Sequence, residues 1–122
     1  ETGIAGSHLS NVLHKPKRFN GNDLYENDES IEVPDINANR NDYKILSWEI
    51  KAGDAIAFDF RTLHGASENV NKLSRRRIFS ARIVGDDAFF VDRGGKGSPP
   101  FENIKLKTGD KLVGEEFPII YQ

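Results

Sequence analysis

Two kinds of side chain near the middle of the chain have the types and spacing to serve one chemical site. His64 ends an apolar run and precedes Gly65, and the consecutive arginines Arg75, Arg76 and Arg77 follow in the same stretch. Imidazole is a common ligand of transition metals, and a guanidinium binds a carboxylate through two parallel hydrogen bonds. These residues therefore suit a metal ligand and an anion-binding group at one mouth of a β-barrel. They also suit a structural histidine and a solvated arginine edge.

The combination is more informative than either member alone. A non-haem iron site requires imidazole and carboxylate ligands on one face of a barrel. A 2-oxoacid that chelates the iron requires an arginine for its far carboxylate. His64 with an arginine nearby therefore favours an iron-dependent site as a hypothesis, beside the structural interpretation.

Composition bounds what such a site can be. The chain has 122 residues, so it holds a single domain at most or forms part of a larger fold. Its 17 basic and 19 acidic residues give a net charge of −2, which provides no basic field for a nucleic-acid partner. Without cysteine, any metal must be bound by His, Asp or Glu, and a reducing cytoplasmic location is expected. No apolar run approaches the ~20 residues of a membrane span, so we expect a soluble protein without a membrane partner.

The elements that must position the site are predicted to be short strands. Hydrophobic and polar residues alternate over 43–50, 55–63 and 76–84, the period of two that is typical of strands. Both faces of these strands carry apolar residues, so we expect both faces to be at least partly covered. A Lys-x-Gly-Asp turn is predicted at 51–54 and again at 107–110. With no convincing helix, the pattern indicates an all-β fold, a sandwich or jelly roll.

The segment 11–42 differs from the rest of the chain. It is rich in Asn, Asp, Lys and Pro, and its apolar residues follow neither a helical nor a strand period. So long a stretch without regular structure inside a compact domain is typically a functional loop. We therefore expect a lid or substrate loop here.

Several motifs resemble the C-terminal half of the phytanoyl-CoA dioxygenase family. The most specific are DFRTLHGASEN (59–69) and RRIFSARIVGDD (76–87), which contain HG-x-x-x-N and R-R-x-x-S-x-R-x-x-G-D-D. The opening 1–8 is similar, in shortened form, to the family's Pro-Gly-Ser-His turn. The resemblance implies a cupin-like double-stranded β-helix, or jelly roll, of which 1–122 would be the C-terminal part and a partial barrel. It also implies Fe(II), 2-oxoglutarate and O₂ as cofactor and cosubstrates, and hydroxylation of a small molecule.

Carried over residue by residue, the resemblance gives His64 the role of the distal histidine ligand of the metal. Arg76 matches the arginine that binds 2-oxoglutarate if the motif is aligned on Ser80, which is itself a candidate contact of the cosubstrate. Arg75 takes that role instead if the loop is counted from His64 without an insertion. Alternation over 76–84 favours Arg76, because it would share a strand face with Ser80. No catalytic residue beyond the metal ligand is predicted.

The other iron ligands of the family form a His-x-Asp pair. None of the three histidines, His8, His14 and His64, has Asp or Glu at the second following position. A single histidine cannot hold Fe(II) in a facial site. We therefore predict that this chain alone is inactive and that a segment N-terminal to Glu1 carries the pair, in agreement with the absence of any methionine.

Two other classes of function remain open from the sequence. A non-catalytic jelly-roll module that binds a small organic acid, a sugar or a protein partner would use His64 and Arg76 as structural or anion-binding groups. A nucleic-acid patch at 75–77 has no support from net charge or from interleaved aromatic residues.

Overall fold

The computed structural model describes residues 2–18, 20–26, 28–95, 97–98 and 100–121. The chain divides into two compact units. The first unit comprises Glu1–His14 and Ser30–Ile78, and the second comprises Lys15–Glu29 and Phe79–Gln122. His64 and the arginine cluster at 75–77 belong to the first unit.

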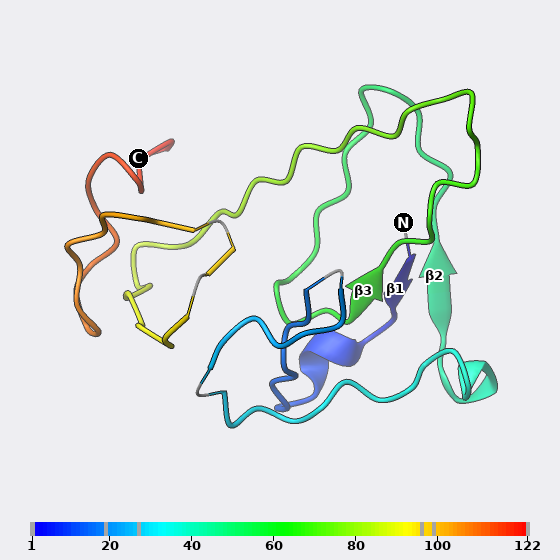
Figure 1. The fold of residues 1–122 in the computed structure, drawn as a ribbon, viewed down its shortest axis with the longest axis horizontal. Helices are drawn as coiled ribbons and strands as arrows, with labels where there is room; N and C mark the ends of the chain where they lie inside the picture. The colour runs from blue at the N-terminus through cyan, green and yellow to red at the C-terminus, as the bar shows by residue number, and fades with distance from the viewer. Residues whose placement is uncertain (1, 19, 27, 96, 99, 122) are drawn as a thin grey trace. The chain divides into compact units, whose positions relative to one another are not determined.

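The first unit contains a small antiparallel sheet. Its strands are β1 (Thr2–Ile4), β2 (Ile45–Ser47) and β3 (His64–Gly65). Their order is β2-β1-β3, so the chain's first strand lies in the middle (Figure 1). Gly3 faces Leu46 on one side and His64 on the other. A contact between residues distant in sequence therefore brings His64 into the sheet.

Outside the sheet, the described residues form two short 3₁₀ helices, η1 (Ser7–Leu9) and η2 (Arg40–Asp42), and isolated β-bridges. No α-helix occurs in the ranges that the structure describes, as the sequence predicts. Gly6, at φ 76°, adopts the left-handed conformation that turns the chain from β1 into η1. Within the same ranges, no helix has the length and apolar character that crossing a membrane would take.

Three predicted strands differ from the observed ones. The strand over 43–50 shrinks to β2, and the strands over 55–63 and 76–84 are wrong, because no strand forms in either segment and only Leu63, next to β3, is bound to β1 by a backbone hydrogen bond. Alternation only describes how side chains would divide between two faces, whereas a strand also needs a partner for its N–H and C=O groups. The chain instead enters β3 through a tight turn, in which the Thr62 N–H donates to the Asp59 carbonyl at 2.9 Å.

Both predicted Lys-x-Gly-Asp turns are confirmed. In the first, the Lys51 N–H donates to Asp54 Oδ2 at 2.8 Å and the Asp54 N–H donates to the Lys51 carbonyl at 3.1 Å. Gly53 lies between them and has φ 100°, a conformation that is unfavourable for residues with a Cβ atom. The second turn repeats both hydrogen bonds at 2.7 and 2.9 Å, with φ 97° at its glycine, through Lys107, Gly109 and Asp110.

The apolar side chains are less covered than expected. No large hydrophobic side chain is fully buried among the described residues, and Trp48, Phe60 and Phe79 are 41%, 81% and 90% exposed. The expected partial cover is found over 43–50, where Trp48 is more than half covered, but not at Phe60 and Phe79, because three short strands offer too little surface to cover them. What the structure contains is a mostly non-helical chain with a small antiparallel sheet, and the jelly roll stays a prediction.

Candidate functional site

His64 is the first residue of β3, at the edge of the sheet. Its Nδ1 lies 2.8 Å from the carbonyl oxygen of Thr62, and its ring packs against Phe58 with centroids 4.5 Å apart and planes tilted by 49°. A carbonyl oxygen only accepts hydrogen bonds, so Nδ1 carries the proton and donates it. In the neutral ring the lone pair is then on Nε2. This is the arrangement in which a histidine binds a metal through Nε2, with its other nitrogen held by the backbone.

The backbone on both sides of His64 is bound to the N-terminal segment. The Leu63 N–H donates to the hydroxyl of Ser7 at 2.9 Å, and the Leu63 carbonyl accepts from the Ile4 N–H at 2.9 Å. After His64, the Thr2 hydroxyl donates to the Gly65 carbonyl at 3.1 Å. The three residues 63–65 are therefore fixed against β1 and the turn that follows it.

An ion pair closes the turn that precedes β3. The Asp59 carboxylate accepts from the backbone N–H of Arg61 at 2.9 Å, from its Nε at 3.0 Å and from its Nη2 at 3.1 Å. These hydrogen bonds favour the charged carboxylate and are the main reason that the pKa of Asp59 is lowered to about 2. The pKa of Arg61 is raised for the same reason. The sequence suggested a continuous strand here, and this side-chain pair explains why a turn forms instead.

The loop between β3 and the arginine cluster is held by two side chains. Arg76 donates from Nη1 to the carbonyl of Ser67 at 2.8 Å. Asn69 donates from Nδ2 to the carbonyl of Ser74 at 2.9 Å and accepts from the Asn71 N–H at 3.2 Å. Ser67 is the third residue after His64, so their Cα atoms lie at most about 11 Å apart. The guanidinium of Arg76 is thus tethered close to the strand that carries His64.

The remaining predicted site residues are Arg75 and Ser80. Arg75 is exposed and makes no hydrogen bond or ion pair within the described part of the chain. Ser80 belongs to the second unit, whereas Arg76 belongs to the first. Because no strand forms over 76–84, the shared strand face that favoured Arg76 is absent, and that part of the sequence argument was wrong.

The histidines do not form a metal cluster. Nowhere in the described ranges do three or more His, Cys, Asp or Glu side chains gather closely enough to hold a metal ion. His14 is engaged elsewhere, since its Nδ1 donates to the Glu32 carbonyl at 3.2 Å. His64 fits one position of a facial iron site, because its free nitrogen is Nε2 and its ring is exposed. The residues present therefore fit one protein ligand of such a site.

Sequence reasoning missed the residues that hold His64 and Arg76 in place. Ser7 lies in the Gly-Ser-His turn and Asn69 ends the HG-x-x-x-N motif, but neither motif predicts what these side chains bind. The sequence cannot indicate that the Thr62 carbonyl accepts the imidazole proton, because every residue has a backbone carbonyl. Phe58 falls in the strand predicted over 55–63, and that prediction gives no indication of its contact with the imidazole ring.

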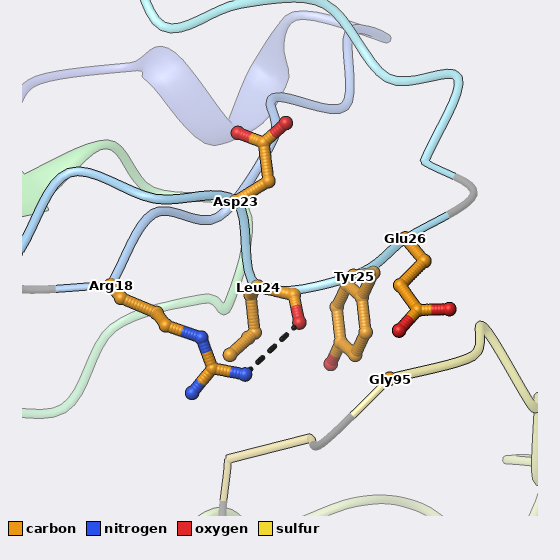
Figure 2. A pocket seen from close by; sticks show the side chains of 6 residues that line it. All are labelled: Arg18, Asp23, Leu24, Tyr25, Glu26 and Gly95. Carbon is orange, nitrogen blue, oxygen red and sulfur yellow. Dashed lines mark hydrogen bonds between the residues drawn. The ribbon is translucent and has the colours of Figure 1, made fainter.

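A separate hollow of about 470 Å³ lies within the second unit (Figure 2). Two of the residues that line it are joined by a hydrogen bond, from Arg18 Nη2 to the Leu24 carbonyl at 3.4 Å. Arg93 lies over the ring of Tyr25, 5.4 Å from its centroid. Most of the residues that line the hollow come from the segment 11–42. The lining residues are Arg18, Asp23, Leu24, Tyr25, Glu26 and Gly95. The hollow is open and polar, and His64 does not line it.

Comparison with protein families assigns residues 3–77 to phytanoyl-CoA dioxygenase (PhyH). This range is more than half of the chain, and it runs from β1 through His64 to the arginine cluster, leaving Ser80 outside. Comparison with curated proteins and with solved structures gives no match. The family match thus covers the sheet, the Ser7 and Asp59 turns and the loop that ends at Arg76. The chain belongs to the phytanoyl-CoA dioxygenase family.

Proposed function

We propose that this chain is the C-terminal part of a non-haem Fe(II)/2-oxoglutarate-dependent dioxygenase that hydroxylates a small molecule. The phytanoyl-CoA dioxygenase family consists in general of Fe(II)/2-oxoglutarate-dependent oxygenases. The observation that carries the proposal is the state of His64 within the matched range. Its Nδ1 proton is donated to the Thr62 carbonyl, so Nε2 is free to bind a metal.

In this proposal, His64 supplies one iron ligand and the other two come from a His-x-Asp pair in a segment N-terminal to this chain. Bound Fe(II) and 2-oxoglutarate supply the oxidation, in which O₂ is consumed, 2-oxoglutarate is decarboxylated to succinate and a substrate C–H bond becomes C–OH. The chain's own part is to hold the imidazole in one orientation. Phe58, packed on the ring, limits its rotation and shields one side of it from water.

Arg76 is the proposed ligand of the far carboxylate of 2-oxoglutarate. One of its five N–H donors is used by the Ser67 carbonyl, so the others remain for a carboxylate. The hydrogen bond fixes the side chain near β3, which lowers the entropy lost on binding. Among the described residues Arg75 has no such tether, and it is the alternative ligand. Ser80 is a further proposed contact of the cosubstrate, on the strength of the R-R-x-x-S-x-R motif alone.

The proposed fold is a partial jelly-roll barrel that the rest of the domain completes. Its support is the antiparallel sheet together with the exposed apolar side chains, such as Phe60 and Phe79. Apolar area of this kind is normally covered in a stable domain. The segment 11–42 is the proposed lid or substrate loop, the substrate is a small molecule, and the absence of cysteine supports a cytoplasmic location.

The assignment of the arginine is tested by measuring 2-oxoglutarate affinity calorimetrically, with Fe(II) and without O₂, on protein that includes the proposed upstream segment. Arg76→Ala should weaken binding about 10- to 100-fold, which is the loss expected for a charge-assisted pair of hydrogen bonds. Arg75→Ala is the matched control and should leave affinity within about twofold. If Arg75→Ala weakens binding and Arg76→Ala does not, the roles are reversed. If neither variant changes the affinity, the carboxylate is not bound at this cluster.

A non-catalytic jelly-roll module that binds a small organic acid, a sugar or a protein partner is the second candidate. It is favoured by the fact that, in the described part of the chain, His64 is not accompanied by two further metal-ligating side chains. Such a module would bind an organic acid through Arg76 with the same affinity in the presence and absence of Fe(II). An affinity for 2-oxoglutarate that rises with Fe(II) separates the two candidates.

A further inference from the structure

The hydroxyl of Ser7 bridges two backbone segments beside the candidate site. It donates to the Ile4 carbonyl at 2.8 Å and accepts from the Leu63 N–H at 2.9 Å. We infer that Ser7 is a positioning residue, which fixes the orientation and tautomer of the His64 imidazole through the intervening peptide group.

One planar peptide unit connects Ser7 to His64. The N–H of Leu63 and the C=O of Thr62 belong to the same peptide unit, whose atoms lie in a plane with the two groups pointing in opposite directions. Ser7 holds the N–H end of this unit, and the C=O end accepts the Nδ1 proton of His64 at 2.8 Å. Fixing one end fixes the direction of the other. The hydroxyl therefore sets where the acceptor of the imidazole proton lies.

The hydrogen bonds form a continuous chain with one direction. His64 Nδ1–H donates to the Thr62 carbonyl, the Leu63 N–H of the same peptide donates to Ser7 Oγ, and the Ser7 O–H donates to the Ile4 carbonyl. Hydrogen bonds linked in this way polarise one another. The result stabilises the proton on Nδ1 and raises the electron density at Nε2, the nitrogen that would bind a metal.

The surroundings of Ser7 agree with this role. The Leu63 carbonyl is held separately by the Ile4 N–H at 2.9 Å, so the backbone before His64 is fixed at two successive positions. The turn that places Ser7 depends on Gly6, whose positive φ of 76° lets the chain reverse after β1. Ser10, in the same turn, donates only to the Ser7 carbonyl at 2.7 Å and so offers a matched control.

The consequence for metal binding rests on the proposed function, in which His64 is an iron ligand. Loss of a group that orients a metal-binding histidine typically costs 10- to 100-fold in metal affinity, and we expect Ser7→Ala to fall in about that range. The orientation and tautomer of the imidazole are measured without metal, so the result does not depend on whether His64 binds iron.

The test is ¹⁵N NMR of the histidine side chains in the uniformly labelled, metal-free full-length protein, at about pH 8 where imidazoles are neutral. The unchanged chain should show two widely separated nitrogen resonances for His64, with the proton on Nδ1. In Ser7→Ala this separation should collapse toward the average of the two tautomers. Ser7→Thr, which keeps the hydroxyl, and Ser10→Ala, which leaves the Leu63 N–H bonded, should both retain the separation.

A folded Ser7→Ala chain that keeps the separated resonances overturns the inference, as does an unchanged chain in which His64 already populates both tautomers. If the amide spectrum of Ser7→Ala loses its dispersion, that variant has unfolded, and Ser7→Thr then tests the role of the hydroxyl. A folded Thr variant with one tautomer supports the role of the hydroxyl, and one with both tautomers contradicts it. Failure to bind Fe(II) with 2-oxoglutarate in the longer protein would overturn the proposed function and leave this result untouched.

Discussion

The carboxylate of Asp59 accepts two hydrogen bonds from the guanidinium of Arg61, from Nε at 3.0 Å and from Nη2 at 3.1 Å. The pair closes the turn that leads into β3, and it thereby sets where the strand bearing His64 begins. Both side chains are partly exposed, so the pair matters for local geometry rather than for overall stability.

This pair predicts a shifted carboxyl titration. The pKa of Asp59 falls from 3.8 to about 2, mainly through the hydrogen bonds from Arg61. Because the folded pKa lies below the unfolded one, the turn gains its full stabilisation above about pH 4 and loses it as the pH falls toward 2. Carboxyl ¹³C NMR should show this low midpoint, and Arg61→Gln should raise it toward 3.8.

Lys17→Gln is the control for that titration. Lys17 forms an ion pair with Asp23 and lowers the pKa of that carboxyl instead. The variant should raise the midpoint of Asp23 and leave that of Asp59 unchanged. An Asp59 midpoint near 3.8 in the unchanged chain would show that the pair with Arg61 does not form in solution.

The close approach of Gly3 to Trp48 predicts a size limit at the centre of the sheet. A Cβ at Gly3 would lie 3.5 Å from Trp48 Cη2 and 3.8 Å from Thr62 Cγ2, which are ordinary contacts. Gly3→Ala should therefore stabilise the chain by about 0.4–1 kcal/mol, because it restricts the unfolded chain. Gly3→Val should destabilise it by about 1–3 kcal/mol through overpacking.

Urea unfolding, followed by the fluorescence of Trp48, measures both changes. Gly65→Val serves as the control, since no atom lies within 4 Å of a Cβ added there. Equal stability changes for valine at the two positions would mean that the packing of Gly3 against Trp48 is absent.

The two Lys-x-Gly-Asp turns predict a matching pair of backbone effects. Gly53 and Gly109 have φ of 100° and 97°, and a Cβ at either position would meet no atom within 4 Å. Alanine should therefore cost about 1–2 kcal/mol at each through backbone strain alone. Amide hydrogen exchange should report the loss in the unit that holds the turn, while Gly65→Ala, where φ is not positive, should cost much less.

Asn69 predicts a separation between cosubstrate binding and metal binding. Its side chain ties the loop that carries Arg76, through the Ser74 carbonyl and the Asn71 N–H. Asn69→Ala should weaken 2-oxoglutarate binding about fivefold, the equivalent of ~1 kcal/mol for lost loop order, and leave Fe(II) binding unchanged. Ser74→Ala is the control, because only the carbonyl of that residue takes part. Calorimetric titration measures both ligands, and a loss of Fe(II) affinity in Asn69→Ala would contradict this role.

The sequence predicts the local features well and the pairing poorly. The turns at 51–54 and 107–110 depend on a Gly with positive φ and an Asp that accepts its neighbour's N–H, and both signals lie within four residues. The strands predicted over 55–63 and 76–84 fail because hydrophobic alternation does not reveal whether a partner strand lies alongside. In the first of these segments, the Asp59–Arg61 pair turns the chain before it can extend.

The sequence likewise predicts the main residues of the candidate site but not the contacts that hold them in place. The histidine at the end of an apolar run and the arginine in its motif are visible in the sequence, and the family match covers both. The bond from Leu63 to the Ser7 hydroxyl is invisible, because it joins residues 56 positions apart and any serine could make it. The tether of Arg76 to Ser67 replaces the strand-face argument, which fails with its strand.

The most direct test of the proposed chemistry is an anaerobic absorption spectrum. Fe(II) and 2-oxoglutarate are added to protein that includes the proposed upstream segment, and the metal-to-ligand charge-transfer band of the bound chelate is recorded. We predict a visible band that disappears in His64→Ala and that requires more 2-oxoglutarate to appear in Arg76→Ala. A folded protein that shows no band, or a band unchanged in His64→Ala, would contradict the assignment of this chain to an iron-dependent dioxygenase site.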